Sequence, residues 1–294
     1  MNNHTNYKIG IIGIGVLGSA IAKCILDQKV TLYGFDISKK FLKNLNKNYF
    51  KFCLSIKEVF KNTDVIITCL PTEQSLLEIS NNILSKKLII ETSTLPVECK
   101  NNAKKFILKN GSNIVDAPVS GNRISALNGQ LSSYLSGAKK DKQIAELILK
   151  LFCKQVTDVG AFGNGIIMKL IGNILNLVHN AVTAEVMILG MKSGLSPKII
   201  HEAISGTFSS SGVFENRGKL MVDEDYSKEG MNFSIPMKDS KYITDLSREK
   251  SVGIPIYQVA LQYYYSAIAH GLRDKDASSI LKILEKNSNF KRPN

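Results

Sequence analysis

A lysine and an asparagine lie one helical turn apart in an otherwise apolar stretch of the chain. Lys169 is the only charged residue between Gly165 and Val178, and Asn173 follows it by four positions, so a helix would place both side chains on one face. A lysine among apolar side chains is rarely buried unless it is paired or used, and burial lowers its pKa toward the range of a proton-transfer group. Spacing alone equally allows a lysine that extends to the surface along an apolar stem. The pair is a candidate for acid–base chemistry, and the rest of the chain decides between the two interpretations.

The stretch around this pair predicts one long helix. It runs from Gly165 to about Lys192 without a proline. Between Gly165 and Val178 apolar residues would occupy nearly every side of that helix, which is typical of a buried one.

A glycine-rich turn near the N-terminus predicts a dinucleotide site. An apolar run ends at Ile12, the turn Gly13-Ile-Gly15-Val-Leu-Gly18 follows, and an amphipathic helix comes next. In this arrangement the first glycine permits the tight turn, the second lets the backbone approach a pyrophosphate, and the third lets helix and strand pack closely. The N-terminus of the helix then faces the phosphates. The predicted cofactor contacts in this turn are Gly13, Ile14, Gly15, Val16, Leu17 and Gly18.

Asp36 ends the next apolar run, residues 30–35, and favours NAD over NADP. A carboxylate at this separation from the glycines is suited to the ribose hydroxyls of the adenosine and would repel a 2′-phosphate. Lys39 and Lys40 follow and partly offset that charge, so NADP remains possible. The same position is compatible with a second interpretation, in which Asp36 caps a helix over residues 38–48.

Strand and helix patterns keep alternating up to about residue 160. Apolar runs at 64–70, 87–91 and 112–116 each end in small, polar or proline residues, and two later strands are predicted at 131–136 and 155–159. In doubly wound sheets the ligand binds at the carboxyl ends of the strands. Beyond Gly165 only helical patterns remain, near residues 197–204, 237–250, 255–270 and 275–286. We therefore predict an α/β Rossmann-type doubly wound sheet in residues 1–162, followed by an all-α C-terminal domain in residues 163–294.

Composition narrows the class of protein. The net charge is +13, but the lysines are dispersed without basic runs or interleaved aromatic residues, so we predict no nucleic-acid partner. The sequence contains no run of eighteen uncharged apolar residues, so we predict no membrane span. The polar N-terminus lacks the apolar core of a secretion signal, so we expect a cytoplasmic protein. The five cysteines contain no Cys-x-x-Cys pair, and the helical histidines have no companion ligands, so no metal site is predicted.

Several motifs, in order along nearly the whole chain, resemble the β-hydroxyacid dehydrogenase family, which includes 3-hydroxyisobutyrate dehydrogenases and glyoxylate/succinic semialdehyde reductases. They are the glycine turn, Leu70-Pro71, Ser93-Thr94, Asp116-Ala-Pro-Val-Ser-Gly121, Gly165-x-x-x-Lys169-x-x-x-Asn173 and Lys238-Asp239. The resemblance implies a Rossmann domain, with a cofactor domain like that of 6-phosphogluconate dehydrogenase, and a helical domain through which subunits pair. We therefore expect a homodimer or homotetramer.

The resemblance also implies roles for single residues. Lys169 matches the catalytic acid/base, and Asn173 matches the asparagine that orients lysine and substrate. Ser120 and Gly121 match the residues that bind the substrate carboxylate. Thr94 and Lys238 match contacts to the cofactor, as do Leu70 and Pro71.

Asn122 and Arg123 depart from the pattern of many members, which have a second glycine at the position of Asn122. Together with Gly129-Gln130-Leu131 they resemble the glyoxylate/succinic semialdehyde reductase branch, and Arg123 is a candidate contact to a second carboxylate. Those relatives commonly prefer NADP and carry Asn-Arg-Thr where this chain has Asp36-Ile-Ser38. The two signals disagree on the branch, so the substrate stays open.

The predicted reaction is reversible hydride transfer between a nicotinamide cofactor and a short β-hydroxyacid or semialdehyde acid, with Lys169 as general acid/base. An imine reductase-like enzyme is one alternative, against which Lys169 argues because that class usually lacks the lysine. A catalytically silent NAD-binding scaffold is the other, and the presence of both Lys169 and Asn173 argues against it.

Overall fold

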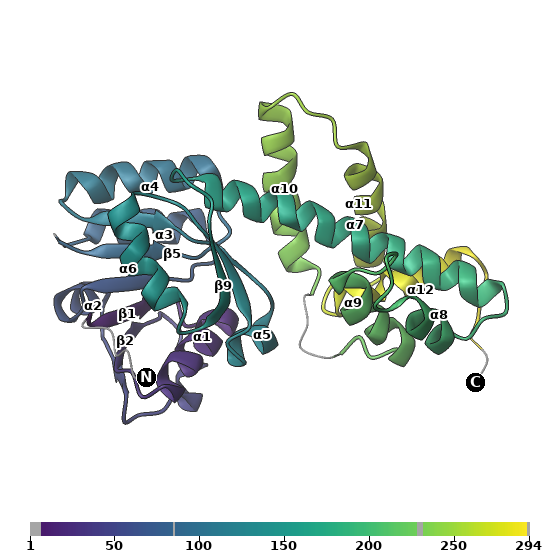
Figure 1. The fold of residues 1–294 in the computed structure, drawn as a ribbon, viewed down its shortest axis with the longest axis horizontal. Helices are drawn as coiled ribbons and strands as arrows, with labels where there is room; N and C mark the ends of the chain where they lie inside the picture. Colours follow the sequence, from purple (N-terminus) through teal and green to yellow (C-terminus); the bar gives the residue numbers. More distant parts are fainter. Residues whose placement is uncertain (1–6, 85, 228–231, 293–294) are drawn as a thin grey trace. The chain divides into compact units, whose positions relative to one another are not determined.

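The computed structural model describes residues 7–84, 86–227 and 232–292. The chain divides into two compact units, Met1–Lys169 and Leu170–Asn294. The first is a layered α/β unit and the second is helical (Figure 1).

A parallel sheet of six strands, in the order β3-β2-β1-β4-β5-β6, forms the centre of the first unit. The strands are β1 (Ile9–Ile12), β2 (Leu32–Phe35), β3 (Phe50–Phe52), β4 (Val65–Thr68), β5 (Leu88–Glu91) and β6 (Asn113–Asp116). The order reverses between β1 and β4, and a crevice at the carboxyl ends of the strands is expected at such a point. The predicted doubly wound sheet is confirmed.

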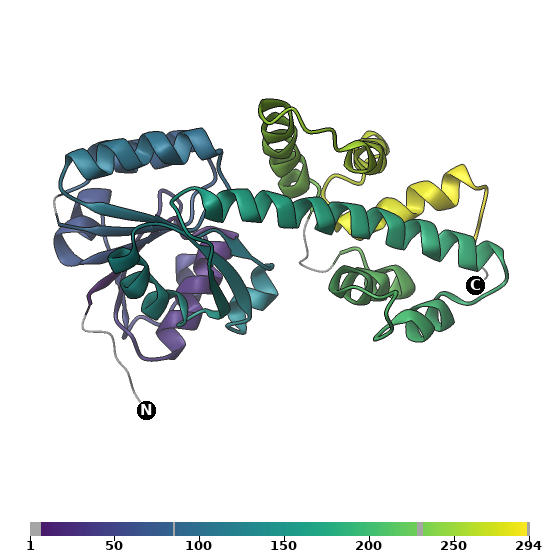
Figure 2. The same cartoon turned by 45° about the horizontal axis from the view of Figure 1, so that its top comes forward.

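Helices cover both faces of this sheet, which explains why the strands are continuous apolar runs (Figure 2). Successive side chains of a strand point to opposite faces. Ile9 and Ile11 of β1 therefore join one buried cluster with α1, while Ile12 joins the other with α2 and α3. The helices of this unit are α1 (Val16–Asp27), α2 (Ile56–Asn62), α3 (Glu73–Asn82), α4 (Val97–Lys109), α5 (Arg123–Leu127) and α6 (Lys139–Leu149).

The two late strands do not extend the main sheet but form a second one. β8 (Leu131–Leu135) pairs antiparallel with β7 (Val119–Ser120) and parallel with β9 (Cys153–Asp158). A bridge between Asp116 and Ser136 ties the end of β6 to this small sheet. Neither β3 nor β7 was predicted, because strands of two or three residues carry too little periodicity to be recognised.

The helix considered for residues 38–48 is not present. That segment contains only the short 3-10 turn Leu42–Asn44, which begins after Phe41, so Asp36 caps no helix there.

The long helix predicted around Lys169 is α7, Asn164–Lys192, with 29 residues. The prediction that this helix is buried on all sides is wrong. Met168, Ile171 and Leu175 are 38, 46 and 54% exposed, because one stripe of the helix faces outward. By length and composition α7 is long and apolar enough to cross a membrane, although core helices pass the same test, and 44% of its most apolar window is buried within the chain.

In the second unit, helices surround the part of α7 that follows Lys169 (Figure 1). They are α8 (Pro197–Ile204), α9 (Gly212–Asp223), α10 (Ser234–Glu249), α11 (Pro255–Ala269) and α12 (Ile280–Asn287), with a 3-10 turn at Ala277–Ser279. Ser196 caps α8 by accepting from Ile199 N, and Pro197 occupies the first turn, where its missing N–H costs nothing. The predicted all-helical character is confirmed, and α9 was not foreseen.

Candidate active site

The glycines of the first turn are needed for different reasons. A Cβ on Gly13 would lie 2.2 Å from the Cys69 carbonyl oxygen, and one on Gly18 would lie 2.0 Å from the Gly13 carbonyl oxygen. Gly13 also has a φ of +93°, which side chains disfavour. A Cβ on Gly15 would meet no atom within 4 Å. Packing therefore demands the first and third glycines, and the second faces open space.

The N-terminus of α1 is prepared for an anion. Gly15 precedes the helix without a side-chain cap, and no acidic residue lies in its first turn. Val16 is 57% exposed, whereas Ile14 is buried and Leu17 packs on the core, so the last two can offer only backbone to a ligand. Uncapped backbone N–H groups at a helix start, beside open space at Gly15, fit the pyrophosphate of a nicotinamide dinucleotide.

Asp36 lies at the carboxyl end of β2 and is bound to the glycine turn. Its carboxylate accepts from Ile14 N at 2.6 Å and from Ser38 N at 2.6 Å. The carboxylate therefore lies beside the turn where a dinucleotide would bind, as expected of a ribose ligand. The contact with Ile14 N could not be foreseen from spacing.

The loops after β4 and β5 are held together by a side-chain hydrogen bond. Leu70 N donates to Ser93 Oγ at 2.8 Å, and Ser93 N donates to the buried Glu91 carboxylate at 2.9 Å. Thr94 is half-buried beside them and Pro71 is exposed. The structure thus brings the Leu70-Pro71 and Ser93-Thr94 motifs to one edge of the sheet.

The segment from Ser120 to Arg123 forms a tight connection between β7 and α5. Gly121 has a φ of +131°, and a Cβ there would lie 2.6 Å from Leu131 Cδ2. The Asn122 side-chain oxygen caps α5 by accepting from Ser125 N at 2.9 Å. Arg123 is half-buried in the first turn of that helix. Asn122 therefore already has a structural role at the place where a substrate contact was predicted.

Lys169 and Asn173 are both buried on α7, at 8 and 7% exposure. Lys169 ends the first unit and Asn173 belongs to the second. In the second unit the Asn173 side-chain N–H donates to Asp239 Oδ2 at 2.8 Å, and Lys238 Nζ lies 3.3 Å from Asp239 Oδ1.

Asp239 is the residue that sequence reasoning quoted but gave no role. It is 3% exposed, and it contacts two of the predicted site residues. Asp239 Oδ2 accepts from the Asn173 side-chain nitrogen, so this nitrogen faces Asp239 and the side-chain oxygen of Asn173 points away from it. Its adjacency to Lys238 in the sequence was the only signal.

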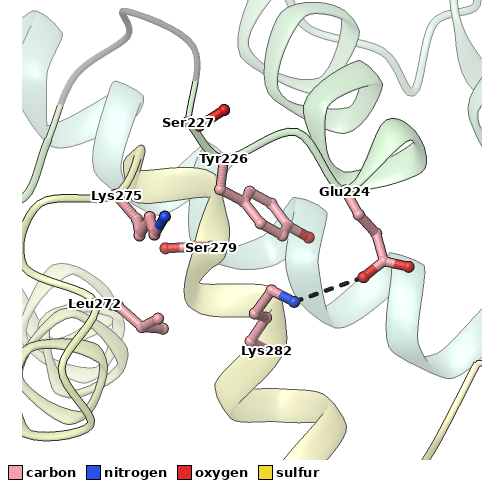
Figure 3. A pocket seen from close by; sticks show the side chains of 7 residues that line it. All are labelled: Glu224, Tyr226, Ser227, Leu272, Lys275, Ser279 and Lys282. Carbon is pink, nitrogen blue, oxygen red and sulfur yellow. Dashed lines mark ion pairs between the residues drawn. The ribbon is translucent and has the colours of Figure 1, made fainter.

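A separate cavity of about 350 Å³ lies in the second unit (Figure 3). Its lining includes Tyr226, Ser279 and the ion pair of Glu224 with Lys282, whose atoms are 3.5 Å apart. It shares no residue with the predicted site.

Two family models match consecutive parts of the chain. The NAD binding domain of 6-phosphogluconate dehydrogenase matches residues 8–160, and the NAD-binding domain of NADP-dependent 3-hydroxyisobutyrate dehydrogenase matches residues 163–284.

Named relatives cover nearly the whole chain. L-threonate dehydrogenase of Cupriavidus necator is 28% identical over 94% of this chain and 95% of its own length. The mitochondrial 3-hydroxyisobutyrate dehydrogenase of Rattus norvegicus is 28% identical over 96% of this chain and 88% of its own length. The crystal structure of 3-hydroxyisobutyrate dehydrogenase from Salmonella typhimurium has the same fold, with a TM-score of 0.84 at 23% identity, over 95% of this chain and 100% of that one.

These matches confirm the resemblance that the sequence motifs indicated. The chain belongs to the β-hydroxyacid dehydrogenase family of NAD(P)-dependent oxidoreductases, with a cofactor domain of the 6-phosphogluconate dehydrogenase type.

Proposed function

We propose that this protein transfers hydride between NAD(H) and a short hydroxyacid or semialdehyde acid, with Lys169 as the general acid/base. The observation that carries the proposal is a buried lysine on α7, 8% exposed, in a chain of this family. A buried lysine needs a partner or a use, and proton transfer at the carbonyl oxygen is such a use.

The residues of the first unit hold the cofactor and the substrate carboxylate. The turn Gly13–Gly18 and the N-terminus of α1 bind the pyrophosphate, Asp36 binds the ribose hydroxyls, and Leu70, Pro71 and Thr94 border the nicotinamide side. The bound nicotinamide supplies or accepts the hydride. Ser120 Oγ and Gly121 N–H bind the substrate carboxylate, and such positioning provides much of the rate.

Lys169 moves the proton. In reduction its ammonium donates to the oxygen that becomes the alcohol, and in oxidation its neutral amine takes the hydroxyl proton. Asn173, whose amide is oriented by Asp239, holds the substrate oxygen, and Lys238 closes over cofactor and substrate. Arg123 contacts a second carboxylate on longer substrates, and Asn122 shapes that end of the site. We place the domain boundary after residue 162, with cofactor binding in 1–162 and the helical substrate and pairing domain in 163–294.

Initial rates test the proposal. NADH and NADPH are each paired with glyoxylate, succinic semialdehyde, tartronate semialdehyde and methylmalonate semialdehyde, and NAD is paired with L-threonate and 3-hydroxyisobutyrate. We expect turnover of at least one acid with the NAD pair. Lys169→Ala should abolish turnover while NADH still binds, whereas Lys192→Ala, at the exposed end of the same helix, should behave as wild type. A Lys169→Ala enzyme with nearly normal kcat would refute the role of the lysine.

The two alternatives predict different results. An imine reductase would turn over imines and none of these acids, and a silent scaffold would bind NADH without any turnover. The relatives named as hydroxyacid dehydrogenases favour the main proposal over both.

We further propose a homodimer or homotetramer in which α7 contributes to the contact. The outward stripe of this helix is mostly apolar, with Met168, Ile171, Leu175, Val182 and Leu189 between 38 and 70% exposed, and the exposed Glu185 interrupts it between the last two. Exposed apolar side chains in such a row are typical of subunit interfaces. Light scattering coupled to size-exclusion chromatography measures the mass, and a monomer at micromolar concentration would contradict the proposal.

We propose a cytoplasmic location without a nucleic-acid or membrane partner, since the apolar helix α7 has a role in a family enzyme and the surface lysines are dispersed. Cell fractionation tests this, and recovery of the protein with membranes would contradict it.

A further inference from the structure

The start of α7 is capped from a distance. The first N–H groups of a helix have no partner within it and need an acceptor from elsewhere. Here Ile166 N donates to Asp116 Oδ2 at 2.8 Å, and Gly165 N donates to Ser136 Oγ at 3.0 Å. Both acceptors come from strand ends in the α/β unit, so the first turn of α7 is attached to the sheets.

The attachment is close as well as polar. A Cβ on Gly165 would lie 2.5 Å from the Tyr134 carbonyl oxygen and 2.9 Å from Asp116 Oδ2. Backbone atoms of a strand cannot yield to such a contact. The glycine therefore lets the helix start approach the strand ends to hydrogen-bonding distance.

Asp116 is itself held by a buried cation. Lys100 Nζ lies 2.7 Å from Asp116 Oδ1 and 4.0 Å from Glu91 Oε1, and all three side chains are 0% exposed. The Ser136 hydroxyl lies 3.2 Å from Asp116 Oδ2. The Asp116 carboxylate is thus fixed on one oxygen by Lys100 and on the other by the serine and the helix, as a buried charge must be to be tolerated.

This cluster lies on the face of α7 that carries Lys169. Positions three and four residues apart on a helix are neighbours on one face. Lys169 follows Ile166 by three residues and Gly165 by four, and Asn173 follows Lys169 by four. A shift or fraying of the first turn would therefore displace the Lys169 amine directly. Asp116 also begins the segment that leads to Ser120 and Gly121.

We propose that Asp116, held by Lys100 and aided by Ser136, is a positioning residue that sets Lys169 by capping the start of α7. It touches neither substrate nor cofactor in this role. The proposal rests on the proposed function for its catalytic consequence, but the capping itself is independent of turnover.

Two serines, one within β8 and one directly after it, allow a matched test. Ser136 and Ser133 are both buried, at 0 and 1% exposure, and both hydroxyls lie within hydrogen-bonding distance of a backbone carbonyl of the segment 116–117. Ser136 Oγ also accepts from Gly165 N, and this hydrogen bond joins Ser136 to α7. Ser136→Ala removes this acceptor, and Ser133→Ala is the control with the same change of side chain.

Hydrogen exchange reads the capping without turnover. We expect the Gly165 and Ile166 amides to exchange about 3- to 10-fold faster in Ser136→Ala, since one buried hydrogen bond is worth about 1 kcal/mol. Ser133→Ala should exchange there as wild type. Equal protection in both variants would overturn the proposal.

Kinetics read the consequence for Lys169. We expect kcat per NADH-binding site to fall about 10-fold in Ser136→Ala and further in Asp116→Asn, with the Kd for NADH changed less than about threefold. The solvent deuterium isotope effect on kcat should rise in both, because proton transfer becomes slower. A merely structural loss would lower the number of NADH-binding sites and leave kcat per site and the isotope effect unchanged, which would overturn the proposal.

The two proposals fail in different ways. A wild-type protein without turnover on any of the acids would refute the proposed function, and the exchange comparison of Ser136→Ala with Ser133→Ala would still decide the capping. Faster exchange with unchanged kcat per site would leave the proposed function standing and overturn the positioning of Lys169.

Discussion

Substituting alanine at Gly15 and at Gly18 should separate cofactor binding from folding. A Cβ on Gly15 meets nothing within 4 Å, whereas one on Gly18 lies 2.0 Å from the Gly13 carbonyl oxygen. The two glycines are three residues apart in one motif. If the open space at Gly15 is where the pyrophosphate approaches, the two changes should have different effects.

For Gly15→Ala the stability terms nearly cancel. Gly15 precedes α1 with a φ of −77°, which alanine adopts without strain. Alanine is a poorer residue than glycine at this position by roughly 0.5–1 kcal/mol, and the lower entropy of the unfolded chain returns about 0.4–1 kcal/mol. We expect the free energy of unfolding to stay within about 0.5 kcal/mol of wild type.

NADH affinity should fall in the same variant. The added methyl occupies the space through which phosphate oxygens reach the N–H groups at the start of α1, so we expect Kd to rise at least about tenfold, a loss of about 1.4 kcal/mol. In Gly18→Ala the turn or the helix must move, which costs about 1–3 kcal/mol of stability or more.

Urea unfolding followed by circular dichroism and calorimetric titration with NADH measure the two quantities. Gly253→Ala is the control, because its Cβ also meets nothing within 4 Å and the residue lies in the helical unit outside the glycine turn. A Gly15→Ala protein that binds NADH as wild type would refute the assignment of that space to the cofactor. One that unfolds as readily as Gly18→Ala would refute the steric reasoning.

Three further changes have expected outcomes. Asp36→Asn should shift the ratio of kcat/KM for NADH to that for NADPH toward NADPH by about tenfold, because it removes the charge that repels a 2′-phosphate; an unchanged ratio would remove Asp36 from the ribose site. Leu175→Glu, on the outward stripe of α7, should dissociate the oligomer, as measured by light scattering. Leu147 on α6 is 50% exposed, and Leu147→Glu should leave the oligomer intact; equal masses of the two variants would exclude the stripe as the interface. Burial raises the pKa of Glu91 despite the nearby Lys100 charge, so the folded state binds the Glu91 proton more tightly than the unfolded state does. The stabilisation that results from this difference is complete below pH 4.5 and is lost as the pH rises. The Tm of wild type relative to Glu91→Gln should therefore decrease from pH 4.5 upward, and a flat difference would contradict the raised pKa.

The main sheet could be predicted from sequence because its signals are local. Strands buried on both faces are short apolar runs, and the glycine turn has a fixed place between a strand and a helix. The same reasoning missed β7, since two residues carry no period, and it could not tell that β8 and β9 form their own sheet. Sheet membership depends on pairing partners distant in sequence, which periodicity does not encode.

The candidate site was predictable to the extent that its residues lie in motifs. Spacing placed Asn173 beside Lys169, but nothing local indicated that Asp239, 66 residues later, would orient its amide. The outward stripe of α7 was missed for a related reason. This helix, apolar on nearly all sides in sequence, is buried by its own chain on some sides and exposed on others, and composition alone does not distinguish the two.

The structure explains why the motif Gly165-x-x-x-Lys169-x-x-x-Asn173 begins with a glycine. A glycine inside a helix costs about 1 kcal/mol relative to alanine, so its presence in the first turn of α7 needs a compensating contact. The contact is the approach to Asp116 and Tyr134 that a Cβ would block. Because Lys169 follows this glycine by four residues, the face that is docked on the strand ends is also the face that carries the amine. Gly165 thus allows the first turn of α7 to contact the strand ends, and Lys169 lies one turn later on the same face of the helix.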